Sequence, residues 1–351
     1  MKFLLSGYYG FGNAGDEAVL AAILQAISQQ KSGARFVVTS GNPQNTIARF
    51  NGAQTPVEAI ARQSPRALVD AIRSCDVFIS GGGSLLQDVT SLRNVVYYSG
   101  LLRLARLSRK PAMIYAQGIG PLIRPLSQKL ARIAAQQSRV VTVRDEDSKK
   151  LLEQIGVRRK IEVTADPVWA LSPQSQSLQP KSTPEFGGKT LCASLRPWQG
   201  YDFSREGNLA RGWQNFAQKS GARFRFVPMQ DEIDRPVMEN LATPNVAVIN
   251  TADLHPREIM SLCGDCHAMI AMRLHALIFA AAQGVPCVAV NYDPKVASLA
   301  NIIDAPLLEN LGESELQKLP DFVQSARAMS AQKLAQLQSL ARRNAELAVA
   351  L

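Results

Sequence analysis

An arginine and a histidine two residues apart are the strongest candidates for chemistry in this 351-residue sequence. Arg273 and His275 follow an apolar strand pattern at residues 268–270 and begin an apolar helix pattern. Arginine binds carboxylate or phosphate through paired hydrogen bonds, and histidine transfers protons near neutral pH. The start of a helix also favours anions because its first N–H groups are unpaired. We therefore expect Arg273 and His275 to act on an anionic substrate.

Two more arginines follow strand patterns directly. Arg144 comes after residues 140–143, and Arg196 comes after residues 191–195. The carboxyl ends of parallel strands form the edge where open α/β sheets bind ligands. We expect both arginines to face a cleft between two domains, together with Arg273 and His275, and to bind a small substrate with more than one negative charge. The alternative for Arg144 is a local ion pair with the acids at 145–147, which contributes little if exposed.

A glycine-rich segment near the start matches the dinucleotide pattern G-x-G-x-x-G. It covers residues 10–15, after a strand pattern and before a helix pattern. A nicotinamide site also needs an acid at the end of the second strand, and residues 36–41 contain none. Asp16 and Glu17 follow in the first helical turn, where they favour the helix dipole but repel a diphosphate. We predict a substrate-facing turn here rather than a nicotinamide site.

Three consecutive glycines, Gly81, Gly82 and Gly83, follow another strand pattern. Such a run needs unusual φ values or a close neighbour. We expect this loop to lie beside residues 10–15 at the carboxyl edge of the first sheet and to contact a ligand.

The segment Cys263-Gly264-Asp265-Cys266-His267 has the spacing of a haem attachment motif. The residues before Gly7 are too few for a signal peptide core, and five cysteines form no disulfide framework, so we expect a reducing cytoplasm. A zinc site would need two more ligands at suitable spacing. We predict ordinary packing of small buried cysteines and no metal.

The elements that position these residues alternate between strand and helix, which predicts two α/β domains with parallel sheets. The predicted strands are residues 2–6, 35–39, 76–80, 112–116, 139–143, 190–195, 223–227, 246–249, 268–270 and 287–290, with helices between them. We expect two Rossmann-like doubly wound domains facing each other across a cleft, as in GT-B glycosyltransferases: residues 1–172, a linker at 173–188, and residues 189–328. A long helix over residues 329–351 is expected to pack back on the first domain.

The net charge of +10 lies entirely in the first half of the chain. Residues 1–170 contain 22 Lys and Arg and 12 Asp and Glu, whereas residues 171–351 contain 17 of each. This excess favours an anionic partner, such as a phosphate-bearing substrate, an acidic lipid surface or nucleic acid. Apolar residues make up 46% of the chain and charged residues 19%, which indicates a folded globular protein, and no apolar run is long enough to span a bilayer.

Six short motifs in a fixed order resemble the polysaccharide pyruvyltransferase family. They are Asn13-Ala14-Gly15-Asp16-Glu17, Gly81-Gly82-Gly83, Gln117-Gly118-Ile119-Gly120-Pro121, Val143-Arg144-Asp145, Asp166-Pro167 and Arg273-Leu274-His275. The resemblance is strongest to the bacterial branch that modifies cell-wall polysaccharide for the anchoring of surface-layer proteins.

This resemblance implies transfer of a pyruvyl group from phosphoenolpyruvate to a sugar as a cyclic ketal. The expected acceptor is an N-acetylmannosamine residue of a lipid-linked disaccharide. By similarity, Arg144, Arg273 and Leu274 hold phosphoenolpyruvate, and His275 is the general acid and base. Arg196 is an additional candidate for that substrate, and Asn13, Asp16, Glu17 and Gly81–Gly83 are candidates for the acceptor side or the cleft.

No cofactor or metal is expected, with phosphoenolpyruvate as co-substrate, and no nucleic-acid partner. We expect a cytoplasmic protein. Leucines and four cations mix in residues 101–110, so this segment either rests on the inner face of an anionic membrane or is a helix that covers the sheet with a solvated basic face.

Three other functions stay open from the sequence. A GT-B glycosyltransferase that uses a nucleotide sugar also needs basic groups and a glycine-rich loop. An NAD(P)-binding oxidoreductase or sensor is suggested by residues 10–15 alone. A non-enzymatic anion-binding protein would use the arginines without needing His275.

Overall fold

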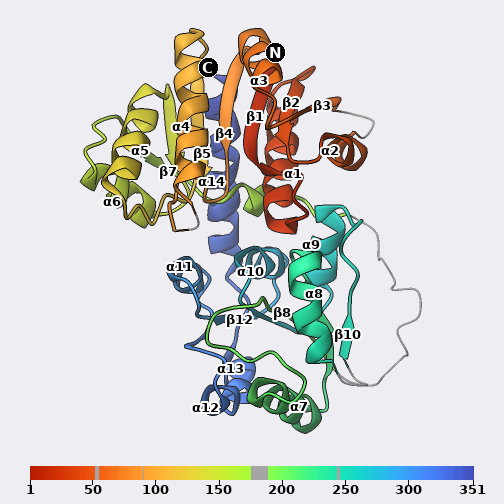
Figure 1. Cartoon of the computed structure of the whole chain (residues 1–351). Coiled ribbons are helices and arrows are strands. Elements are labelled where there is room, and N and C mark those ends of the chain that lie inside the picture. Colours follow the sequence, from red (N-terminus) through yellow and green to blue (C-terminus); the bar gives the residue numbers. More distant parts are fainter. Residues whose placement is uncertain (52–54, 90, 175–188, 243–245) are drawn as a thin grey trace. The chain divides into compact units, whose positions relative to one another are not determined.

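The computed structural model describes residues 1–51, 55–89, 91–174, 189–242 and 246–351 (Figure 1). These residues form two compact units. The first unit contains residues 1–11, 16–171 and 335–351, and the second contains residues 12–15 and 172–334. The short turn Gly12–Gly15 thus belongs to the second unit, although the chain on both sides of it belongs to the first.

The first unit is built on a seven-stranded parallel sheet with the order β3-β2-β1-β4-β5-β6-β7. Its strands are β1 (Lys2–Tyr9), β2 (Arg35–Ser40), β3 (Val57–Ala61), β4 (Val77–Gly81), β5 (Ala112–Gln117), β6 (Val140–Val143) and β7 (Glu162–Val163). The strand order reverses direction between β1 and β4. Crevices at such a reversal, outside the carboxyl ends of the strands, are where open α/β sheets bind ligands.

Helices connect these strands because each parallel neighbour requires a crossover. They are α1 (Ala14–Gln30), α2 (Pro43–Phe50), α3 (Pro65–Ser74), α4 (Leu92–Leu107), α5 (Pro125–Gln137) and α6 (Glu146–Gln154), followed by a short 3-10 helix, η1 (Pro167–Ala170). Side chains of α3, α4, α5 and α6 share one hydrophobic core with the sheet. Local capping helps to begin them, since Ser64 caps α3, Ser91 caps α4 and Asp145 caps α6.

The last helix, α14 (Ala331–Val349), is tied to the first sheet through a buried asparagine. The Asn344 side-chain oxygen accepts hydrogen bonds from the hydroxyls of Thr142 at 2.6 Å and Thr164 at 2.9 Å. Its side-chain nitrogen donates to the Ala165 carbonyl at 3.4 Å. Buried polar groups need such partners, so these bonds fix the position of α14 beside β6 and β7.

The second unit has a six-stranded parallel sheet with the order β10-β9-β8-β11-β12-β13. Its strands are β8 (Thr190–Ser194), β9 (Arg223–Phe226), β10 (Val246–Val248), β11 (Ala268–Ala271), β12 (Cys287–Val290) and β13 (Leu307–Leu308). Its helices are α7 (Asn208–Ser220), α8 (Asp231–Asn240), α9 (Pro256–Gly264), α10 (Leu274–Ala281), α11 (Pro294–Ile302), α12 (Glu313–Leu316) and α13 (Leu319–Ser325). The fully buried Trp213 packs against Phe216, Phe224 and Phe226 in its core.

The prediction of two parallel α/β sheets and a long C-terminal helix is confirmed, and all ten predicted strands are present. The sequence analysis missed α2, β3, β7, η1, α11, β13, α12 and α13. The predicted linker at 173–188 lies, apart from residues 173 and 174, outside the described residues.

Candidate functional site

Arg144 lies at the carboxyl edge of the first sheet, where three segments hold its guanidinium. Its Nη1 donates to Asp166 Oδ2 at 3.1 Å, and its Nη2 donates to Ser84 Oγ at 3.2 Å. Its Nε lies 3.5 Å from Asp145 Oδ2. The side chain is 9% exposed, so these bonds orient it firmly. The local ion pair between Arg144 and Asp145, which was the alternative interpretation, is therefore present. Nη1 and Nη2 each have a second N–H group that can donate to a ligand.

Two glycine segments allow this close packing around Arg144. A Cβ on Gly118 would lie 2.7 Å from Arg144 Nη2, so the loop after β5 leaves room for the guanidinium only as glycine. Gly82 and Gly83 have φ values of 44° and 69°, which confirms the predicted unusual backbone. The amide of Gly118 also donates to the Gly83 carbonyl at 2.9 Å. Both glycine loops therefore meet beside Arg144.

The backbone amides of the glycine-rich turn at residues 10–15 donate hydrogen bonds within the protein. The Gly10 amide donates to Glu17 Oε1 at 2.7 Å, and the Gly15 amide donates to Asn13 Oδ1 at 3.0 Å. Within the second unit, the Ala14 amide donates to the Met229 carbonyl at 2.6 Å. A dinucleotide site needs such amides for the diphosphate. Their engagement argues against nicotinamide binding at this turn.

The loop at Gly81–Gly83 lies beside Tyr9 and Asp16, the residues that flank the glycine-rich turn at 10–15. A Cβ on Gly83 would lie 2.9 Å from Asp16 Oδ1, and the Tyr9 hydroxyl donates to the Gly81 carbonyl at 3.3 Å. Asp16 is partly exposed, whereas Glu17 is 2% exposed. Burial raises the pKa of Glu17 to about 7, and the hydrogen bond from Gly10 lowers it only in part.

We expect Glu17→Gln to change how stability depends on pH. The folded protein binds the Glu17 proton more tightly than the unfolded chain, so ionising Glu17 costs stability as pH rises from about 4.5 to about 7. Glutamine carries no charge, so the variant should gain up to about 3 kcal/mol relative to the parent over this window. Urea unfolding at both ends of the window measures the gain. Glu58→Gln, at an exposed carboxylate, is the control, and an equal gain there would contradict the assignment.

The second sheet brings two predicted residues to its own carboxyl edge. Strands β8 and β11 are neighbours with Ser194 opposite Ala271, and Arg196 and Arg273 each follow two residues later. The Arg196 guanidinium lies 5.4 Å from the ring centres of both Trp198 and Tyr292. The strand order reverses between β8 and β11, so this edge also has the geometry of a ligand site.

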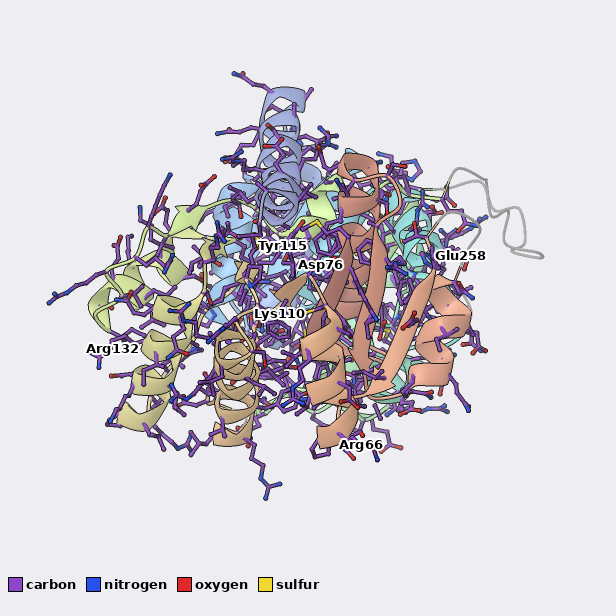
Figure 2. All side chains as sticks on the ribbon, turned by 90° about the horizontal axis from the view of Figure 1, so that it is seen from above. Arg66, Asp76, Lys110, Tyr115, Arg132 and Glu258 are labelled. Carbon is purple, nitrogen blue, oxygen red and sulfur yellow. The ribbon has the colours of Figure 1, made fainter. Side chains whose placement is uncertain are left out.

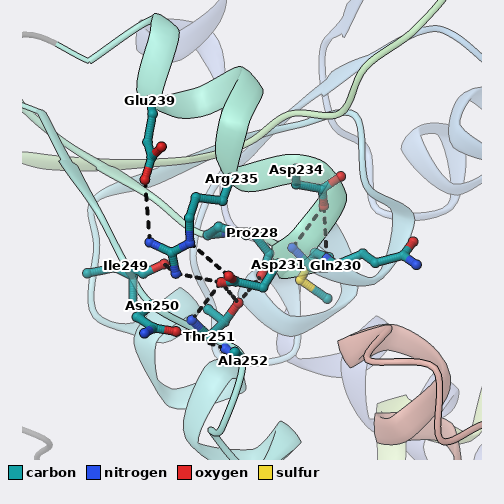
Figure 3. Close-up of polar contacts among 11 residues, drawn as sticks. Pro228, Gln230, Asp231, Asp234, Arg235, Glu239, Ile249, Asn250, Thr251 and Ala252 are labelled. Atoms are coloured by element: carbon teal, nitrogen blue, oxygen red, sulfur yellow. Dashed lines mark hydrogen bonds and ion pairs between the residues drawn. The ribbon is translucent and has the colours of Figure 1, made fainter.

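Arg273 forms a buried pair with Asp234, a residue that the sequence analysis missed. The Arg273 Nε donates to Asp234 Oδ2 at 2.9 Å, and its Nη2 donates to Asp234 Oδ1. Asp234 is fully buried on α8 and also accepts from the amides of Met229 at 3.0 Å and Gln230 at 2.9 Å (Figure 3). Asp234 thus orients Arg273 and accepts hydrogen bonds from its Nε and Nη2.

A second ion pair, between Asp231 and Arg235, lies within α8, and both of its residues are hydrogen-bonded to the segment that follows β10. Asp231 accepts two hydrogen bonds from Arg235, both at 2.7 Å, and further bonds from the amide and hydroxyl of Thr251 (Figure 3). Burial raises the pKa of Asp231, but the bonds from Arg235 and Thr251 outweigh it and lower the pKa below its usual value. The helix that carries Asp234 is thus fixed to the segment after β10 by hydrogen bonds between its own charged side chains and Ile249 and Thr251.

His275 lies in the first turn of α10, beside the turn from the chain's beginning. A Cβ on Gly15 would lie 2.2 Å from His275 Nδ1, so the imidazole packs directly on the Gly15 backbone. Leu274, next to it, is buried. The first and last motifs of the predicted family therefore meet within the second unit. No periodicity or spacing in the sequence predicts this contact.

A cluster of aromatic residues around Arg62 was not predicted. The Arg62 guanidinium lies 4.5 Å from the Tyr97 ring centre and 5.3 Å from that of Phe11. Tyr8, 38% exposed, stacks on Phe11 with ring centres 4.3 Å apart. Arg62 directly follows β3, one of the missed strands. The sequence analysis therefore did not place Arg62 at the end of a strand.

The Cys-x-x-Cys-His segment is used for packing. Cys263 is buried at the end of α9, and His267 accepts a hydrogen bond from the Thr190 amide at 3.1 Å through Nδ1. Within the described part of the chain, no three His, Cys, Asp or Glu side chains are grouped as metal ligands.

The predicted site residues therefore fall into two groups. Arg144, Asp16, Glu17 and Gly81–Gly83 belong to the first unit, and Asn13, Arg196, Arg273, Leu274 and His275 belong to the second. That both groups serve one substrate stays a prediction.

Solved structures with the same fold include enzymes of nucleotide-sugar metabolism. UDP-GlcNAc 2-epimerase from Methanocaldococcus jannaschii has a TM-score of 0.70 and 12% identity, with 99% of this chain and 98% of that chain covered. The enzyme from Neisseria meningitidis, bound to UDP-GlcNAc, has a TM-score of 0.64 and 15% identity over the full length of both chains. At this identity the likeness shows the fold, which is the predicted GT-B-like pair of α/β domains.

Sequence relatives point to a family. The amylovoran biosynthesis protein AmsJ of Erwinia amylovora is 20% identical over 92% of this chain and 89% of its own length. The model of the polysaccharide pyruvyl transferase family matches residues 13–294, which include every predicted motif. The chain therefore belongs to the polysaccharide pyruvyl transferase family.

Proposed function

We propose that this protein transfers the pyruvyl group of phosphoenolpyruvate to two hydroxyls of a sugar, forming a cyclic ketal. Membership of the family supports a transferase that places pyruvyl groups on polysaccharide. The observation that carries the finer proposal is the edge of the second sheet, where Arg196, Arg273 and His275 follow neighbouring strands. Guanidinium groups beside an imidazole suit a substrate with both a carboxylate and a phosphate.

The reaction balances with protons alone. A proton adds to the methylene carbon of phosphoenolpyruvate, and the resulting cationic C2 is attacked by one sugar hydroxyl. Phosphate leaves, and a second hydroxyl adds to C2 to close the ketal, so that the two hydroxyl protons replace the one added to carbon and the one carried away by phosphate. We assign these transfers to His275, which can both donate and accept near neutral pH. Asp234 holds Arg273 in position for the substrate's anionic groups.

We place the acceptor sugar on the first unit. The rings of Tyr8 and Phe11 beside Arg62 combine apolar faces with a hydrogen-bond donor, the two kinds of group that bind a sugar's C–H face and its hydroxyls. The expected acceptor is a lipid-linked saccharide with N-acetylmannosamine, in cell-wall polysaccharide synthesis. The protein is expected in the cytoplasm and needs no further cofactor.

Phosphate release tests the proposed function. Purified protein is mixed with phosphoenolpyruvate and a lipid-linked saccharide fraction from cells that lack the protein. We expect phosphate release that depends on both, and a pyruvate adduct on the saccharide by mass spectrometry. Release of a nucleotide from a sugar nucleotide, without any use of phosphoenolpyruvate, would instead establish the glycosyltransferase alternative.

Arg144→Lys is expected to weaken phosphoenolpyruvate binding about tenfold or more. Lysine has no planar fork, so it cannot keep the contacts to Asp166 and Ser84 while donating outward. Isothermal titration measures the dissociation constant, and thermal unfolding shows that the variant is folded. Arg139→Lys, at the other end of the same strand, is the matched control. If the dissociation constant of Arg144→Lys is unchanged, then Arg144 has only a structural role.

A further inference from the structure

Exposed apolar side chains gather in one stretch of the first unit. Among the described residues, eight large apolar side chains are well exposed, and five of these lie between residues 84 and 137. They are Val89, Val96, Leu107, Ile123 and Leu126, with exposed fractions of 60%, 49%, 67%, 69% and 50%. Single exposed apolar residues are common, but a group of them marks an interaction surface.

The same stretch carries an unusual charge. Residues 84–137 contain eight Lys and Arg and a single acid, Asp88. The Asp88 side chain is buried and accepts hydrogen bonds from the amides of Ile123 and Arg124, both at 2.8 Å. The exposed cations besides Arg124 are Arg93, Arg103, Arg106, Arg109, Lys129 and Arg132. The outer surface of this stretch is therefore positive throughout.

We call the surface that carries most of these residues the α4–α5 face. It comprises the outward side chains of α4 and α5 and of the loops at 84–89 and 118–124. Helices α4 and α5 pack side by side (Figure 1), and Arg132 lies on the outer side of α5 (Figure 2). On α4, Val96, Arg103 and Leu107 are seven and four residues apart, which places them on one face.

The opposite side of α4 belongs to the core. Leu101, Leu102 and Ala105 are buried against the sheet. Helix α4 thus covers the sheet and presents a basic outer face, which is compatible with both alternatives that the sequence left open for residues 101–110. Its exposed leucine and valine are not needed for that role.

We propose that the α4–α5 face docks on an anionic lipid bilayer. Cations bind the lipid phosphates, while valine, leucine and isoleucine enter the boundary between headgroups and acyl chains. A second copy of this chain fits less well, because a symmetric contact would set the six cations of this face against the same six. Nucleic acid would pair with the cations but leave the apolar side chains without a role. Among the described helices, none combines the length and the hydrophobicity that a membrane span requires.

Vesicle flotation tests this docking with the whole purified protein. The probes are vesicles of phosphatidylcholine alone and of phosphatidylcholine mixed with phosphatidylglycerol. We expect binding to the mixed vesicles only, and weaker binding as salt increases. Arg103→Glu/Arg106→Glu should reduce the affinity by at least about 25-fold, because each lost cation costs about fivefold and each new carboxylate adds repulsion. Ile123→Ser/Leu126→Ser should reduce it about tenfold, because apolar burial is lost without a change in charge.

Matched controls lie in the second unit. Arg205→Glu/Arg211→Glu removes the same charge from exposed positions, and Ile233→Ser removes an exposed isoleucine. Both should bind vesicles like the parent, and circular dichroism confirms folding. The proposal is overturned if controls and face variants weaken binding equally, if neither vesicle binds, or if the face variants only dissociate a dimer seen by light scattering. Vesicle binding needs no phosphoenolpyruvate, so this result is independent of the proposed reaction.

Discussion

His275→Ala is expected to bind phosphoenolpyruvate like the parent while phosphate release falls roughly 100- to 10,000-fold, the range for loss of a general acid or base. The arginines that we assign to the substrate stay in place, because Asp234 and the strand ends hold them independently of the imidazole. Isothermal titration gives the affinity, and the acceptor-dependent assay gives the rate. Loss of binding and rate in proportion would assign His275 to binding, and unchanged rates would assign the protons to another group.

Gly15→Ala should reproduce much of this loss without touching a titratable group. The added Cβ would fall 2.2 Å from His275 Nδ1 and 2.7 Å from its Cγ, so the imidazole must move. Gly15 is helical and shows no left-handed φ, which means that alanine itself fits the backbone. A displacement of about 1 Å in a reacting group costs on the order of 100-fold in rate. The turnover rate should therefore fall about 100-fold with the substrate affinity little changed.

Gly100→Ala separates this effect from a general effect of alanine. Gly100 lies inside α4, and a Cβ there would meet no atom within 4 Å. That variant should keep full activity and gain a little stability from helix propensity. If Gly15→Ala keeps full turnover as well, then the close contact with His275 has no part in catalysis.

Sequence reasoning located the strand ends well because buried parallel strands are nearly continuous apolar runs. Strands β6, β8 and β11 have this character, and Arg144, Arg196 and Arg273 could be placed at strand ends in advance. Strand β3 is different. It reads Val-Glu-Ala-Ile-Ala, pairs with β2 at the sheet edge and buries only Val57 fully, so its pattern is weak. Missing β3 also meant missing Arg62, which follows it.

Contacts between residues that are far apart in the chain could not be predicted from the sequence, for a different reason. Asp234 lies 39 residues from Arg273, and Gly15 lies 260 residues from His275. No sequence periodicity or motif links residues at such separations. Each contact arises from the order in which the strands lie in the sheet, and the sequence does not show that order. Asp166 belongs to one of the family motifs, and the structure shows that it accepts a hydrogen bond from Arg144 Nη1.

Asp234→Ala is expected to destabilise the second unit by about 3–5 kcal/mol, the usual cost of leaving one member of a buried ion pair. The Asp234 side chain is fully buried and that of Arg273 is 11% exposed. The substitution leaves a buried guanidinium and the amides of Met229 and Gln230 without their acceptor. Urea unfolding followed by tryptophan fluorescence in a Trp169→Phe background reports on this unit, because the two remaining tryptophans, Trp198 and Trp213, both belong to it.

Two comparisons show whether charge is the cause. Asp265→Ala breaks a pair with Arg225 in the same unit, but Asp265 is 70% exposed, so the loss should be about 1 kcal/mol or less. The double variant Asp234→Ala/Arg273→Leu removes both charges and should recover part of the stability lost in Asp234→Ala, because no unpaired charge remains buried. If the double variant is as unstable as the sum of its single changes, packing rather than the ion pair holds α8 against α10. Recovery of stability without recovery of phosphoenolpyruvate binding would show that the pair's energetic role and its role for the substrate are separate.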